Sequence, residues 1–172
     1  MSDIVTLERK KIFDIPCGNV VITHHPHDPA ADVVICLKID RIGKEYMHHY
    51  LVPLDPTPDD TLQLIYADPD DIAIDCAVGV VFDLGEGENA GDIRPEIGDI
   101  FINESGVYLK IKDDPKTQKH FGYVDIDANL VRVRQERKMK TVHRKWRVSP
   151  GVPGESSEAT FSDLRRAHLA QR

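Results

Sequence analysis

Cysteine is scarce in this chain, and the spacing of the few cysteines limits what they can do. Only three are present, Cys17, Cys36 and Cys76. They lack the C-x-x-C pairs that zinc sites use, and an odd number argues against a disulfide framework. We therefore expect three reduced, mostly buried thiols in a protein that is located in the cytoplasm or within a particle assembled there.

Long hydrophobic runs and the common catalytic fingerprints are also absent from the sequence. No apolar run approaches the roughly 20 residues that a membrane-spanning helix needs. The N-terminal sequence MSDIVTLERKKIFDIP lacks the apolar segment of a secretory signal. The chain contains no P-loop, no G-x-G-x-x-G fingerprint and no G-x-S-x-G nucleophile elbow. These absences argue against membrane binding and favour a non-enzymatic protein over an enzyme.

Basic side chains are few in the first half of the chain and abundant in the second. Residues 1–90 carry 17 acidic and 6 basic side chains, a formal charge of −11. Residues 91–172 carry 12 acidic and 16 basic side chains, a formal charge of +4. A chain divided in this way can pair with copies of itself or with another charged molecule.

Short β-type runs separated by Pro, Gly and Asp predict a mainly β fold, either a barrel or a sandwich. The clearest run alternates apolar Val107, Leu109 and Ile111 with polar neighbours, which is the period of a half-buried strand. Gly79 interrupts another run and indicates a bulge or a close backbone approach. The runs that predict strands are 20–23, 33–39, 46–54, 62–66, 72–84, 99–102, 107–112, 123–126, 130–134 and 142–148.

Two segments rich in Gly, Pro and acid divide the chain into three parts. The first, 85–91, separates an acidic β-rich module at 1–88 from a basic one at 92–148, and the two modules are separate or joined in one domain. The second, 149–157, introduces a linker and docking helix at 149–172.

The predicted C-terminal helix begins with a capping signal. Thr160-Phe161-Ser162-Asp163 has the S/T-x-x-D/E form of a helix start. Phe161, Leu164 and His168 then share one side of the helix, and a helix of about ten residues is marginal unless it docks on a surface. We expect these three apolar or aromatic side chains to bind a partner.

A cluster of histidines offers the strongest candidate metal site. His24, His25, His27 and Asp28 supply imidazole and carboxylate ligands within one short stretch. A metal-dependent hydrolase or metal-binding enzyme is therefore one alternative function, with a divalent metal as its cofactor. The other interpretation is a solvated loop beside prolines, in which case no cofactor is expected.

The basic segment between residues 130 and 150 offers a candidate binding face. Arg132, Arg134, Lys145 and Arg147 are expected to point outward from strands, where they would contact a protein partner or the phosphates of a nucleic acid. Only 6% of residues are aromatic, and Trp146 shares the parity of inward-facing valines, so few rings remain for stacking on bases. A protein partner is therefore favoured over nucleic acid.

Together these features favour a non-enzymatic structural or interaction protein of a larger multi-subunit assembly. Virus particles and other multi-copy shells, in which small β-rich accessory proteins hold neighbouring subunits together, are examples of such assemblies. The expected partners are copies of the chain itself or other protein subunits. A metal-dependent hydrolase using the histidine cluster and a nucleic-acid-binding β module using the basic face are the alternatives.

Overall fold

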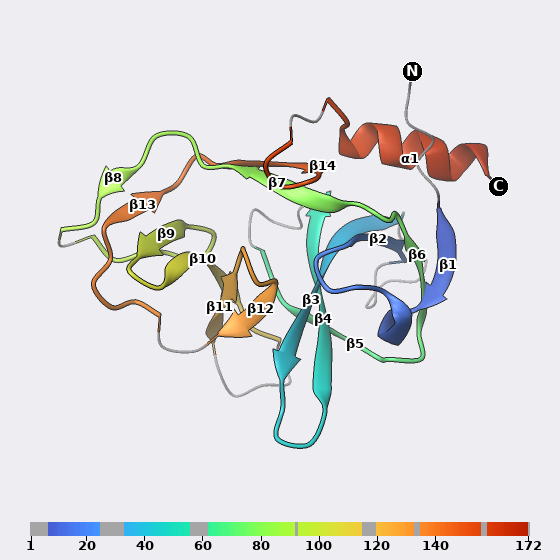
Figure 1. Cartoon of the computed structure of the whole chain (residues 1–172), viewed down its shortest axis with the longest axis horizontal. Coiled ribbons are helices and arrows are strands. Elements are labelled where there is room, and N and C mark those ends of the chain that lie inside the picture. The colour runs from blue at the N-terminus through green and yellow to red at the C-terminus, as the bar shows by residue number, and fades with distance from the viewer. Residues whose placement is uncertain are drawn as a thin grey trace.

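The computed structural model describes residues 7–24, 33–55, 62–91, 93–114, 120–132, 135–155 and 158–171. Its fold is mainly β, as predicted: a mixed sheet of 12 strands, a second sheet of two strands and one short C-terminal helix (Figure 1). The elements are β1 (Glu8–Lys11), a 3-10 turn (Ile12–Asp14), β2 (Val20–Thr23), β3 (Val34–Ile42), β4 (Met47–Asp55), β5 (Ile65–Ala67), β6 (Ile72–Asp75), β7 (Gly79–Asp83), β8 (Glu88–Asn89), β9 (Ile100–Asn103), β10 (Gly106–Lys112), β11 (Phe121–Asp125), β12 (Leu130–Arg132), β13 (Thr141–His143), β14 (Arg147–Gly151) and α1 (Phe161–Ala170).

Six strands of the large sheet close into a barrel. β3 pairs with β4, β4 with β5, and the chain just before β5 meets β10 at the bridge between Gln63 and Lys112. β10 then pairs with β11, β11 with β12, and β12 returns to β3 through Leu130 and Asp40. The barrel therefore takes three strands from the acidic half of the chain and three from the basic half.

The remaining strands of the large sheet extend from two sides of the barrel. β2, β6 and β1 continue from β3, and β9, β13 and β8 continue from β10. Apolar side chains fill the barrel and the space beneath β7 and α1. Buried members of this main core include Ile39, Val52, Leu64, Leu109, Ile111, Val124 and Val131.

β3 is apolar on both faces because it lies between two cores. Its even-numbered and odd-numbered side chains are both buried: Leu37 belongs to the main core, and Cys36 belongs to a second core beside β2 and the 3-10 turn. Lys38 lies in the same strand with 2% of its surface exposed, and its Nζ donates to the carbonyl of Ile15. The unbroken apolar run in the sequence is thus explained by burial on two sides.

The two segments predicted as boundaries contain strands. β14 covers Ser149 to Gly151, which pair with Val81 to Gly79 of β7. β8 lies within the 85–91 segment and pairs with β13. The predicted linker and docking helix at 149–172 therefore begins with three residues that belong to a strand. Strand pairing uses backbone groups, so a sequence without large apolar side chains can still form a strand when a partner strand is available.

Helix α1 begins where the sequence predicts. The Thr160 side chain accepts from the backbone N–H of Asp163 at 3.2 Å, and the Asp163 carboxylate accepts from the N–H of Thr160 at 2.8 Å. The helix docks on its own chain: Leu164 is 1% exposed in the main core, His168 is buried and Phe161 packs beside them. Leu164 and Phe161 of this face therefore contact the main core of their own chain, which provides a docking surface for the helix.

Candidate binding groove

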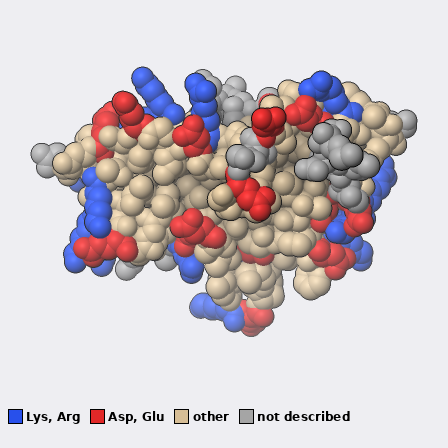
Figure 2. Space-filling model, turned by 45° about the horizontal axis from the view of Figure 1, so that its top comes forward, with Lys and Arg blue, Asp and Glu red and all other residues tan. Residues whose placement is uncertain are grey.

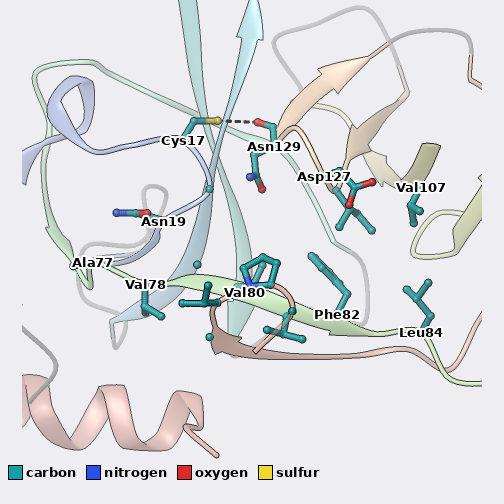
Figure 3. Close-up of a pocket in the computed structure, with 18 residues that line it drawn as sticks. Cys17, Asn19, Ala77, Val78, Val80, Phe82, Leu84, Val107, Asp127 and Asn129 are labelled. Carbon is teal, nitrogen blue, oxygen red and sulfur yellow. Dashed lines mark hydrogen bonds between the residues drawn. The ribbon is translucent and has the colours of Figure 1, made fainter. Parts of the chain in front are cut away.

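A cavity of about 510 Å³ opens along β7, and we call it the β7 groove. It lies between the turn at Cys17, strand β7, the β11–β12 turn and the chain that follows β14 (Figure 3). This size is within the range of small-molecule sites. The apolar part of its lining includes Val78, Val80, Phe82, Leu84, Val107 and Ile126.

The apolar lining follows from the alternation of side chains along β7. Val78, Val80, Phe82 and Leu84 are spaced two residues apart, so they share one side of the strand and pack against the main core. A Cβ at Gly79 would lie 3.3 Å from the carbonyl oxygen of Gly18 and 3.4 Å from that of Gly151. The prediction of a close backbone approach at Gly79 is therefore confirmed.

The polar end of the groove is built from two turns that meet. The Cys17 thiol donates to the backbone carbonyl of Asn129 at 2.9 Å, and Figure 3 shows this contact at the side of the groove opposite β7. In the β11–β12 turn, an oxygen of Asp125 accepts from the N–H groups of Asp127 and Ala128 at 3.2 and 3.0 Å. Asp127, which is exposed, therefore has a fixed backbone at the groove rim.

Asn129 and Gly18 require unusual backbone conformations at this end of the groove. Asn129 has φ of 54° and Gly18 has φ of 93°, both in the left-handed region. A Cβ on residue 18 would lie only 2.5 Å from Nδ2 of Asn129, so a larger residue at position 18 would be strained in its backbone and would displace the Asn129 side chain.

The thiol in the groove is not activated as a nucleophile. Burial, with the nearby Asp40 carboxylate as a second cause, raises the pKa of Cys17 to about 11. Asp40 in turn lies 2.9 Å from Nδ1 of His49 and 3.6 Å from Nζ of Lys38. The neighbour of the thiol is thus a carboxylate and not an imidazole, which keeps the thiol protonated at neutral pH. The groove is better suited to binding than to nucleophilic catalysis.

β7 presents a strand edge at the groove. Within the part of the chain that the structure describes, β7 and β14 form a sheet of two strands, so each has a strand neighbour on one side only. Open strand edges carry backbone N–H and C=O groups that can pair with another extended segment.

The histidine cluster is only partly described. His24 follows β2 and is exposed, whereas His25, His27 and Asp28 lie outside the described residues. His49 of β4 has the Asp40 carboxylate as its partner. No group of three or more metal-binding side chains occurs within the described ranges. The metal site stays a prediction.

Several cations of the basic segment have acidic neighbours. Arg132 lies 3.5 Å from Asp125, and Arg144 lies 3.4 Å from Asp99. These pairs are partly exposed and contribute little stability, but they reduce the local positive charge. Basic and acidic groups are interspersed on the face seen in Figure 2.

The structure describes two of the three remaining residues of the predicted basic face. Lys145 and Arg147 are exposed, and Arg134 lies outside the described residues. Trp146 is half-buried against Phe82 of β7, and its Nε1 donates to the carbonyl of Gly98 at 2.7 Å. The ring thus packs against the core, as its parity predicts. Binding through the basic face stays a prediction.

The β7 groove was not predicted from the sequence. Its walls come from segments that are far apart along the chain, including Cys17, Val107, Asp127 and Val152. The local signals were a glycine after Cys17 and the turn residues Asp127 to Asn129, which indicate turns but not that the turns meet.

Comparison with family models, curated proteins and solved structures finds no significant match to this chain.

The helix that the structure describes is too short and too polar to cross a bilayer.

Proposed function

We propose that this protein is a non-enzymatic interaction protein that binds an extended segment of a protein partner in the β7 groove, as part of a larger assembly. The observation that carries the proposal is the open edge of β7 beside an apolar groove of about 510 Å³. In strand addition, backbone hydrogen bonds supply affinity and pockets for alternate side chains supply specificity.

The lining of the groove matches the chemistry of such a segment. Val80, Phe82 and Val107 provide apolar contacts for side chains that point inward from the added strand. Asp127 at the rim is exposed and negative, which disfavours the phosphates of nucleic acid and favours a basic side chain of a peptide. The contacts at Gly18, Gly79 and Asn129 hold the walls together before a partner arrives, and this lowers the ordering cost of binding.

The proposal is tested with a displayed library of random short peptides, selected on the full chain. Val152 lines the groove and is 49% exposed, so Val152→Arg blocks the groove with little effect on folding. The matched control is Ile72→Arg, which changes an exposed apolar residue of β6 away from the groove.

We expect selected peptides to carry apolar residues at alternate positions and to lose at least about tenfold in affinity on Val152→Arg, which corresponds to ~1.4 kcal/mol. Ile72→Arg should leave their affinity unchanged. Amide chemical shifts of the wild type should change along β7 when peptide is added. A library that yields no binder, or binders that are insensitive to Val152→Arg, would contradict the proposal.

A further inference from the structure

The β3–β4 hairpin ends in an apolar projection, residues 42–47, which we call the hairpin end. Figure 1 shows it extending beyond the rest of the fold, on the side away from β7. Ile42 and Tyr46 are each 65% exposed, and Met47 is 42% exposed. Ile42 and Met47 face each other as a cross-strand pair, so their side chains lie on the same face. Large apolar side chains gathered on a projection of this kind are typical of contact sites.

Both strands have open edges at the hairpin end. β12 pairs with β3 only at Asp40, and β5 pairs with β4 only from His49 to Leu51. Within the described ranges, neither Ile42 nor Met47 has a strand on its outer side. Natural proteins usually protect such edges with charges, prolines or covering segments. Here the only charges are Lys44 and Glu45 in the turn itself.

We propose that the hairpin end of one copy of this chain docks in the β7 groove of a second copy. The inference rests on the proposed function and names its partner. Two features of the same chain are complementary. One is the exposed apolar pair at the hairpin end, on two strands with open edges, and the other is the apolar groove beside the open edge of β7. Lys44 of the hairpin end also carries the charge opposite to Asp127 at the groove rim.

A second copy is favoured over an unrelated partner because each copy carries both surfaces. The hairpin end points away from β7 within one copy, so it cannot fill its own groove (Figure 1). The contact joins two different surfaces, which makes it heterologous and leads to rings or open chains of subunits rather than to closed dimers. This outcome agrees with a protein that works in a multi-copy assembly.

The charges at the projection fit a protein surface better than an anionic membrane. The hairpin end carries one basic and one acidic residue, Lys44 and Glu45, and in Figure 2 basic and acidic groups lie together at the end of the downward projection. An anionic bilayer attracts clusters of basic residues, and the hairpin end has none.

The test measures self-association of the full chain by sedimentation velocity and native mass spectrometry. The hairpin variant is Ile42→Asp with Met47→Asp, and the groove variant is Val152→Arg. Ile72→Asp is the matched control, because Ile72 is 57% exposed on β6, which belongs neither to the hairpin end nor to the groove lining. Circular dichroism and thermal unfolding establish that each variant is folded.

We expect the wild type and Ile72→Asp to form oligomers at micromolar concentrations, and both the hairpin and groove variants to be monomers. A mixture of the two variants retains one intact hairpin end and one intact groove, so it should form one-to-one dimers and nothing larger. Lys44→Glu should weaken association, and adding Asp127→Lys should restore part of it.

Three results would overturn the inference: a monomeric wild type, oligomers that persist in the hairpin variant, or a variant mixture that stays monomeric. A monomeric wild type whose groove still binds selected peptides would leave the proposed function intact and point to a different protein as the partner. Oligomers that depend on the hairpin but not on Val152 would contradict the inference alone, because peptide binding in the groove tests the proposed function separately.

Discussion

Arg165 of helix α1 donates from Nε to Oδ2 of Asp55 at 2.9 Å, although the two residues are 110 positions apart in the sequence. The other guanidinium nitrogens donate to the carbonyls of Asp55 at 2.7 Å and Val33 at 2.9 Å. One side chain therefore ties the C-terminal helix to the end of β4 and to the residue before β3. This contact holds the helix on the barrel beside the apolar contact made by Leu164.

Replacing Arg165 should weaken the attachment of the helix. Arg165→Met keeps the aliphatic stem but removes three hydrogen bonds, and the partly exposed site limits the loss to about 1–2 kcal/mol in the free energy of unfolding. Urea denaturation measures the loss. Arg166→Met is the control, because Arg166 is exposed and pairs with Asp163 of the same helix. Equal effects of the two substitutions would show that the contact with Asp55 contributes nothing.

Removing the Leu164 side chain should destabilise the whole fold. Leu164 is buried in the main core, so Leu164→Ala loses apolar contacts and leaves a cavity, at a cost of about 3 kcal/mol in the free energy of unfolding. Leu169 is 61% exposed on the same helix, and Leu169→Ala should change stability by less than about 0.5 kcal/mol. If both substitutions prove neutral in thermal and urea unfolding, the helix is not docked on the core.

Asp75 should make stability depend on pH in the acid range. Burial raises the pKa of this carboxyl, but hydrogen bonds from Lys10, Ala77 and Asn19 outweigh burial and hold the pKa below its ordinary value. Because the folded pKa is below the unfolded one, the stabilisation is present above the unfolded pKa and is lost as pH falls through the folded pKa.

Asp75→Asn tests this dependence. The variant should be less stable than the wild type at neutral pH and should lose less stability between about pH 5 and pH 3, as followed by urea unfolding across that range. Asp127→Asn, at an exposed position, should keep the wild-type profile. A steeper acid loss in Asp75→Asn than in the wild type would contradict the assignment.

Cys17 should react slowly with alkylating reagents in the folded protein. Its pKa of about 11 leaves little thiolate at neutral pH, and burial raises the pKa of Cys36 and Cys76 to about 12. We expect iodoacetamide to modify Cys17 alone among the three, at a rate that keeps rising with pH up to about 11. Peptide mass spectrometry identifies the site. In denaturant all three should react like ordinary thiols, and a fast reaction of Cys17 at pH 7.5 would contradict the raised pKa.

Local elements were predictable because their signals are local. The alternation from Val107 to Ile111 and the run 99–102 before it predicted two strands, which the structure pairs as β9 and β10. Thr160 and Asp163 predicted the start of α1, since a capping box needs only residues three positions apart. The mainly β class followed from many such short signals, each interpretable without knowledge of the rest of the chain.

Which segments meet was decided only in the tertiary structure. Ser149 to Gly151 have the composition of a linker, but they form the end of β14 because they pair with β7. From the sequence, Leu164 was expected to bind a partner, but in the structure it is buried in the main core of its own chain. The β7 groove and the open edges of the hairpin end likewise depend on contacts between residues far apart in the chain. Short-range patterns specify the period and the ends of an element, whereas burial and strand pairing depend on the neighbours that the whole fold brings together.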